Sequence, residues 1–167
     1  SSEMKRWMYV YFAVDLYTYD LVHIAIYPYN TKESATAFLL AVRAKGYHPQ
    51  VLVSDLRPDY GPAIAAVFPQ AQHHECLFHA LRDGVKHIQN VYGLGYAEHH
   101  PEGVALQEAL AKALNAQTKR TAQKHYDQIM SWQSRYVAAT PHSAAIFDFL
   151  ASHWPTLVNG IESELIP

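Results

Sequence analysis

Two aspartates carry the clearest chemical signal in this sequence. Asp15 lies within the apolar run Trp7–Leu16, and Asp55 ends the short apolar run Val51–Asp55. Aspartate is disfavoured in strands, and an unpaired carboxylate costs free energy to bury, so each of these residues needs a compensating partner. If the two runs form neighbouring strands, both carboxylates point to one place.

Two carboxylates held close together repel each other unless one is protonated or a cation lies between them. Oxygen ligands favour a hard ion, Mg²⁺ or Mn²⁺, and a pair of such ions can activate a nucleophile and stabilise the leaving oxygen of a phosphodiester. We therefore expect Asp15 and Asp55 to be metal ligands. The alternative is that each aspartate caps a turn or pairs with a nearby base such as Arg57.

A second group of candidate ligands lies in the run HHECLFH at residues 73–79. Cys76 and His79 have the C-x-x-H spacing of half a zinc site, but no second pair with suitable spacing occurs elsewhere in the sequence. We therefore favour another interpretation over zinc. Cys76 is then a small buried residue at a strand end, and His79 reaches back from the first turn of a helix to hydrogen-bond near the site.

Strands that position these residues follow from the apolar pattern. Trp7–Leu16 is typical of a central strand buried on both faces, and Leu21–Tyr29 follows as the second strand of an antiparallel hairpin. Val51–Asp55 comes after a helical crossover, which usually returns a strand parallel to its neighbour. A further short strand is expected at residues 72–76.

Helices are predicted between and after these strands. The first begins after Thr31 and ends near Gly46, and its apolar face consists of Ala35, Phe38, Leu39 and Val42. Others are expected at residues 58–68 and 77–91. The stretch from 101 to 157 has helical periodicity, with breaks expected at Thr140–Pro141 and Trp154–Pro155.

Composition bounds the protein class. The chain has 167 residues, of which 50% are hydrophobic, and this suits one compact domain with a real core. Its single cysteine excludes an internal disulfide, and no apolar run approaches the roughly 18 residues that span a bilayer, so we expect a cytoplasmic protein without a membrane partner. The formal net charge is −2, so the chain lacks the excess of positive charge that is expected of a stand-alone DNA-binding protein. Basic residues of the helical half are interpreted as a solvated helix face: Lys112, Lys119, Arg120, Lys124 and Arg135.

The ordered combination of these features resembles a known family. The segments AVDLYT around Asp15 and LVSDLRPDYGPAIAAVFPQAQHHECLFHALRD after the first helix are similar to the DDE transposases of bacterial insertion sequences and their Mutator-like relatives. The resemblance implies an α/β fold: a ribonuclease-H-like mixed sheet with flanking helices, followed by an all-helical insertion. Residues 1–94 would be the core, 95–157 the insertion, and 158–167 a truncated return toward the core.

The same resemblance implies residue roles. Asp15 and Asp55 become the first two catalytic ligands of a two-metal site for Mg²⁺ or Mn²⁺, and Cys76 and His79 become a structural or site-supporting pair. The third acid of such families is a glutamate that opens a late helix. We expect it beyond Pro167, and the competing candidate is Glu162, because residues 159–163 (NGIES) loosely match an Asn-x-Ile-Glu-Ser form seen in relatives.

The function implied by the resemblance is metal-dependent cutting and joining of DNA. Transposon ends and target DNA would be the partners, recognised through a separate DNA-binding domain, and the full-length protein would act as a multimer on the bacterial nucleoid, while this fragment can be monomeric. Two rivals remain. One is a ribonuclease-H-like nuclease without strand transfer, and the other is a catalytically inactive, domesticated transposase domain.

Overall fold

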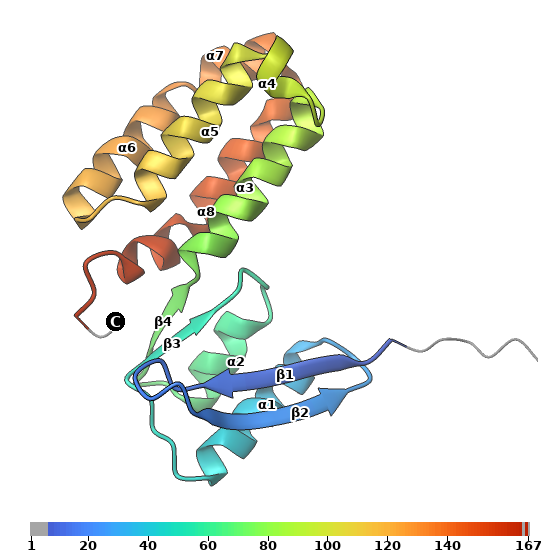
Figure 1. Ribbon diagram of the computed structural model, residues 1–167, viewed down its shortest axis with the longest axis vertical. Helices are drawn as coiled ribbons and strands as arrows, with labels where there is room; N and C mark the ends of the chain where they lie inside the picture. The colour runs from blue at the N-terminus through green and yellow to red at the C-terminus, as the bar shows by residue number, and fades with distance from the viewer. Residues whose placement is uncertain (1–6, 165, 167) are drawn as a thin grey trace, which may run out of the picture. The chain divides into compact units, whose positions relative to one another are not determined.

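The computed structural model describes residues 7–164 and 166, and its described part forms two compact units. The first unit comprises the chain up to His73 together with Glu164 and combines strands with helices, whereas the second, His74–Ser163, is almost entirely helical (Figure 1). An α/β part followed by a helical part is therefore confirmed. The ribonuclease-H-like arrangement of the strands is a separate question, because it depends on how the strands pair.

The first unit begins with the expected antiparallel hairpin. Strand β1 (Tyr9–Val14) pairs with β2 (Leu21–Tyr27), from Tyr9 opposite Tyr27 to Val14 opposite Leu21. The register shifts between Ala13 and Val14, as a β-bulge does. The hairpin prediction is confirmed.

Helix α1 (Lys32–Ala44) follows the hairpin and matches its prediction closely. The Thr31 side chain accepts a hydrogen bond from the Ser34 N–H, which satisfies one of the donors left free at the start of a helix. The four residues predicted for its apolar face are all buried: Ala35, Phe38, Leu39 and Val42. Side chains from β1 and helix α2 (Tyr60–Val67) complete this core.

Strand pairing differs from the prediction. Strand β3 (Val51–Ser54) pairs with β4 (Gln72–Glu75), and β1 pairs with β2, so the described strands form two separate two-stranded sheets. The expectation of one mixed sheet, with β1 hydrogen-bonded beside β3, is therefore not met. Each strand pairs instead with the next strand along the chain, as consecutive elements commonly do.

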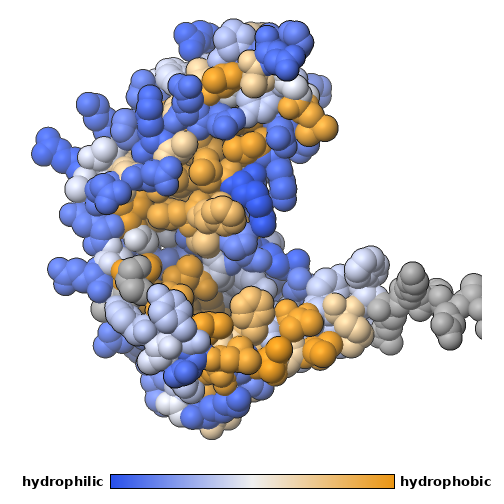
Figure 2. Space-filling view, viewed as in Figure 1, coloured by the Kyte–Doolittle hydropathy of each residue, from blue (hydrophilic) through white to orange (hydrophobic). Residues whose placement is uncertain are grey.

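The burial of β1 also corrects the prediction. Tyr11 is only 6% exposed and packs into the core with Phe38, whereas its neighbours Val10 and Phe12 are 56% and 67% exposed. The opposite residues on β2, Ile26 and Ile24, are likewise exposed, and Figure 2 shows hydrophobic residues gathered over this hairpin. Strand β1 is thus buried on one face only, although both of its faces are apolar in sequence.

The second unit is a packed group of helices. Their bounds are α3 Leu77–Tyr92, α4 Tyr96–His99, α5 Pro101–Leu114, α6 Lys119–Ser131, α7 Gln133–Ala139, a 3₁₀ turn Pro141–Ser143, and α8 Ala144–Gly160. Ile88, Leu106, Phe147 and Leu157 are fully buried between them. Helix α3 packs on α5 and α8, and the compact units divide between His73 and His74, within β4.

The two predicted helix breaks have different outcomes. The break at Thr140–Pro141 is confirmed by the 3₁₀ turn, but the break at Trp154–Pro155 is wrong, because α8 continues through Pro155. Proline removes the N–H that would bond the carbonyl four residues earlier, here that of Ala151. Both Pro155 and Ala151 lie on the exposed side of α8, where solvent can satisfy that carbonyl. Along residues 7–164, none of the helices is both long and apolar enough to cross a membrane.

Candidate functional site

Asp15 lies directly after β1, at the start of the hairpin turn, and its side chain is partly exposed. Its Oδ1 accepts hydrogen bonds from the backbone N–H groups of Thr18 at 3.0 Å and Tyr17 at 2.8 Å. These bonds, the one from Thr18 first, hold the pKa of the Asp15 carboxyl below its usual value. The expected position deep inside a buried strand is therefore wrong, and the alternative of a turn cap describes this residue.

Asp55 occupies a similar position at the end of β3. Its Oδ1 accepts the Arg57 backbone N–H at 3.1 Å, so it also caps a turn. The Ser54 hydroxyl donates to the Asp55 carbonyl at 2.8 Å and lies 2.8 Å from Nε2 of His73. Because the single hydroxyl hydrogen goes to the carbonyl, the His73 ring nitrogen must be the donor in that second bond. Asp55 is thus held by two hydrogen bonds, one to its carbonyl from Ser54 and one to its carboxylate from the Arg57 N–H.

The Arg57 guanidinium does not pair with Asp55, as the alternative had considered. Its Nη2 donates to the Asn30 carbonyl at 2.9 Å and to Asp59 at 3.3 Å. Arg57 therefore joins the loop after β2 to the start of α2, and it leaves the Asp55 carboxylate without a cationic partner of that kind.

Two tyrosines that sequence analysis did not single out lie near Asp55. The Tyr11 hydroxyl donates to the Asn30 side chain, and the Tyr11 and Tyr60 rings meet edge-on at 6.3 Å between centroids. Burial, followed by the negative charge of Asp55, raises the pKa of Tyr60 to about 12. Burial also raises the pKa of Tyr11, and Asp55 contributes there too. The ring contact places the β1 side chain of Tyr11 against the start of α2, a few residues after Asp55 in the chain.

The donor chemistry of the two aspartates suits a hard cation, but the site is incomplete within the described residues. Each carboxylate has Oδ1 engaged by backbone N–H groups, and the Thr18 side chain adds a hydrogen bond to the Asp15 carboxylate. No three His, Cys, Asp or Glu side chains in that part of the chain group closely enough to hold a metal ion. Asp15 and Asp55 would thus supply two ligands, and further ligands would have to come from elsewhere.

The remaining predicted site residues belong to the second unit. Glu162 is exposed, and its carboxylate accepts the Lys119 backbone N–H at 3.1 Å, at the start of α6. Cys76 is a free, half-buried cysteine at the N-cap of α3. Nδ1 of His79 is buried without a hydrogen-bond partner among the described residues. The preferred position of the third acid, beyond Pro167, lies outside the described residues.

Sequence reasoning missed one close pair of titratable groups. Nδ1 of His153, on α8, lies 2.9 Å and 3.0 Å from the two carboxylate oxygens of Glu75, at the end of β4. Glu75 is only 9% exposed, so the imidazole is the partner that compensates its burial. The two residues are separated by 78 positions, and no sequence pattern connects them.

Comparison with models of known protein families finds none that matches this chain, and comparison with curated protein sequences finds no match either.

Proposed function

We propose that this chain is the ribonuclease-H-like core of a DNA transposase, which cleaves and joins phosphodiesters with the help of Mg²⁺ or Mn²⁺. The observation that supports the proposal is the matched position of Asp15 and Asp55. Each follows the last residue of a strand of the first unit, and backbone N–H groups of the next turn hold its carboxylate in place. Carboxylate oxygens are the ligands that these ions prefer.

Within this proposal the chain's own residues have distinct roles. Asp15 and Asp55 are ligands and not nucleophiles, and the turn hydrogen bonds fix the direction of each carboxylate. Asp15 is ionised near neutral pH, as a cation ligand must be, and its lowered pKa extends that ionised range toward acid. A bound divalent ion would supply the activation of water or of a DNA 3′-hydroxyl. DNA is the proposed partner, and the full-length protein is proposed to act on it as a multimer.

The backbone amides that cap the two turns provide a direct test of a shared ion. Paramagnetic Mn²⁺, added well below one equivalent at pH 7, should broaden the amide NMR signals of Tyr17, Thr18 and Arg57 together, because these N–H groups bond to the two carboxylates. Excess Mg²⁺ should restore the signals. Asp55→Asn should then protect Tyr17 and Thr18 as well, since the ion would lose one of its two ligands.

The matched control is Asp148→Asn, which removes an exposed carboxylate from α8 and should leave the broadening unchanged. Broadening confined to one of the two turns would contradict a common cation site. Strand transfer by the full-length protein, assayed with DNA carrying a free 3′-hydroxyl, separates a transposase from a nuclease that only cleaves.

A second candidate, the catalytically inactive domesticated domain, is favoured by one observation. Both aspartates cap turns, which is a structural role, and the described residues do not complete a metal-binding group. This candidate predicts no Mn²⁺ effect at Tyr17, Thr18 or Arg57 and no change in melting temperature on adding Mg²⁺. The same titration therefore decides between the two functions.

A further inference from the structure

Four exposed cations gather at one end of the helical hairpin that α5 and α6 form. Lys112 lies in the last turn of α5, Lys119 and Arg120 in the first turn of α6, and Lys124 one turn later. The helices pack together and are joined by only residues 115–118, so the end of α5 and the start of α6 lie at the same end of the pair. We call these four residues the α5–α6 basic end.

Charge is unusually one-sided in this segment. Residues 109–126 contain these four cations and no Asp or Glu, although the whole chain has a net charge of −2. The ion pairs of lysine and arginine in the described part of the chain involve Arg57, Arg82 and Lys86 instead. The four cations of the basic end therefore form no ion pair among the described residues, although the Glu162 carboxylate contacts the Lys119 backbone and Glu108 and Asp127 flank the segment.

The position of two of these cations is unfavourable for the helix itself. The N-terminus of a helix has a partial positive charge, so acidic residues stabilise it and cations destabilise it. Helix α6 has Lys119 and Arg120 in its first turn and no acidic residue there. A solvated helix face accounts for the exposure of Lys119 and Arg120 but not for their placement at this end. Residues that depart from such a local preference, here the preference against cations at a helix N-terminus, are often residues that serve a function.

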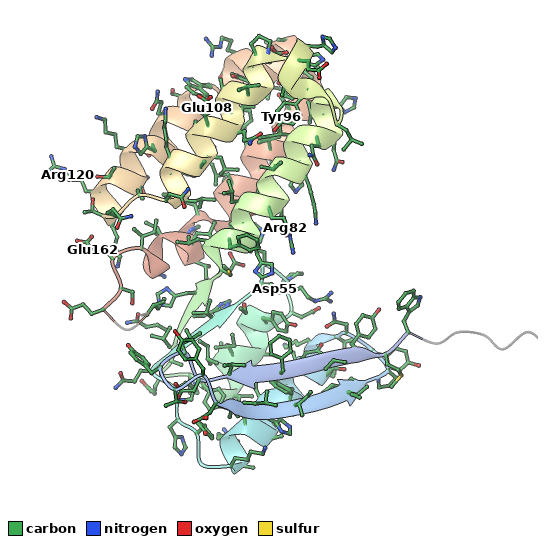
Figure 3. The ribbon with its side chains drawn as sticks, viewed as in Figure 1. Asp55, Arg82, Tyr96, Glu108, Arg120 and Glu162 are labelled. Atoms are coloured by element: carbon green, nitrogen blue, oxygen red, sulfur yellow. The ribbon has the colours of Figure 1, made fainter. Side chains whose placement is uncertain are left out.

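The same end accepts an oxyanion from within the chain. The Glu162 carboxylate accepts the Lys119 backbone N–H at 3.1 Å, and Glu162 has a left-handed φ of 60°. A left-handed backbone is unfavourable for glutamate, and the described part of the chain has it at only one other residue besides glycine, Tyr19. Figure 3 shows Arg120 and Glu162 at this end of the helical unit.

We propose that the α5–α6 basic end binds the phosphate backbone of duplex DNA without regard to base sequence. Arg120 and Lys124 are one helical turn apart, about 6 Å along the axis. Side chains one turn apart lie on the same face of a helix, so Arg120 and Lys124 can approach one strand of the duplex together. The choice of DNA as the polyanion depends on the function proposed above, whereas the charge distribution does not.

The test measures binding of a fluorescent 20-base-pair duplex of random sequence by anisotropy, in EDTA, at several salt concentrations. The variant Lys119→Gln/Arg120→Gln/Lys124→Gln should weaken binding at least tenfold at low salt. It should also reduce the slope of log K against log salt by up to about 3, because each neutralised phosphate contributes about 0.9. The variant should melt no lower than the parent chain, since two of the removed charges oppose the helix dipole.

The matched control removes three exposed cations elsewhere, Lys32→Gln/Lys86→Gln/Arg135→Gln, and so changes the net charge by the same amount. Equal weakening by both variants would overturn the proposal, as would failure of the parent chain to bind DNA at low salt. Equally effective competition by poly-glutamate would replace DNA with an acidic polypeptide and overturn it too. Because EDTA removes any bound metal, duplex binding that persists without a Mn²⁺ effect at Asp15 and Asp55 would end the proposed metal-dependent function and still support the α5–α6 basic end. A Mn²⁺ effect without duplex binding would do the reverse.

Discussion

At the scale of single residues, Asp15 shows how a carboxylate can have two explanations. An aspartate after an apolar run suggests a metal ligand, and the hydrogen bonds from Tyr17 and Thr18 give the same residue a structural role. The two roles are compatible, because a carboxylate has two oxygens and both backbone bonds of the turn go to Oδ1. They predict different effects on stability, however, and that difference can be measured.

We predict that Asp15 makes stability depend on acid pH. Its pKa is lowered in the folded protein relative to an unfolded value of about 3.9. A group whose folded pKa is depressed contributes stability that is fully present above the unfolded pKa and is lost as pH falls through the folded pKa. Urea midpoints measured from pH 6 down to pH 2 should therefore fall more steeply for the parent chain than for Asp15→Asn, which does not titrate.

The same variant separates turn capping from charge repulsion. In metal-free buffer at pH 7, Asp15→Asn should slightly lower the melting temperature, because hydrogen bonds to an ionised acceptor are stronger than those to a neutral one. An increase would mean that repulsion between Asp15 and Asp55 outweighs the turn bonds. That outcome would favour two carboxylates lying close together.

At the scale of elements, strand β1 shows why an apolar sequence does not fix burial. Its inward residues pack on α1, while Phe12 and its cross-strand partner Ile24 remain exposed. An exposed apolar face of this kind commonly marks an interaction surface. The described residues do not indicate what would cover it.

We predict a large contrast between two phenylalanines of the first unit. Phe38→Ala should lower the free energy of unfolding by about 3–5 kcal/mol, as expected for a buried aromatic residue. Phe12→Ala should change it by only about 0.5 kcal/mol, as expected at an exposed position. Urea denaturation checks both, and equal losses would place Phe12 in a second core and restore the original prediction of a strand buried on both faces.

At the scale of the whole molecule, the two units have separate hydrophobic cores. Phe147 is fully buried in the second and packs edge-on against Tyr136, with ring centroids 5.9 Å apart. Proteins unfold locally in cooperative units, so a substitution that destabilises one core should first reduce the protection of backbone amides in the helices around that core.

Phe147→Ala tests this division. We expect a loss of about 3–5 kcal/mol in the stability of the second unit. Amide hydrogen exchange should accelerate more in α3, α5 and α8 than in α1. Phe78→Ala is the control, because Phe78 is 71% exposed and its removal should change exchange little. Uniform acceleration along the chain would show that the two cores unfold as one.

The sequence by itself determined the local elements. The hairpin, the cap at Thr31, the four buried positions of α1 and the helical second half were all predicted, because they depend on periodicity and on residues within a few positions of one another. For the candidate site, it singled out Asp15 and Asp55 and gave turn capping as an alternative role, but it placed only Asp55 at a strand end and put Asp15 inside a buried strand.

Only the tertiary structure decided which segments meet. The sequence does not show that β3 pairs with β4 or that β1 is buried on a single face. Nor does it show the Glu75–His153 contact or the hydrogen bond that Glu162 accepts from the first turn of α6. The physical reason is the same in each case. Burial and long-range hydrogen bonds depend on what packs against a residue, and two apolar faces of one strand look alike until an element covers one of them.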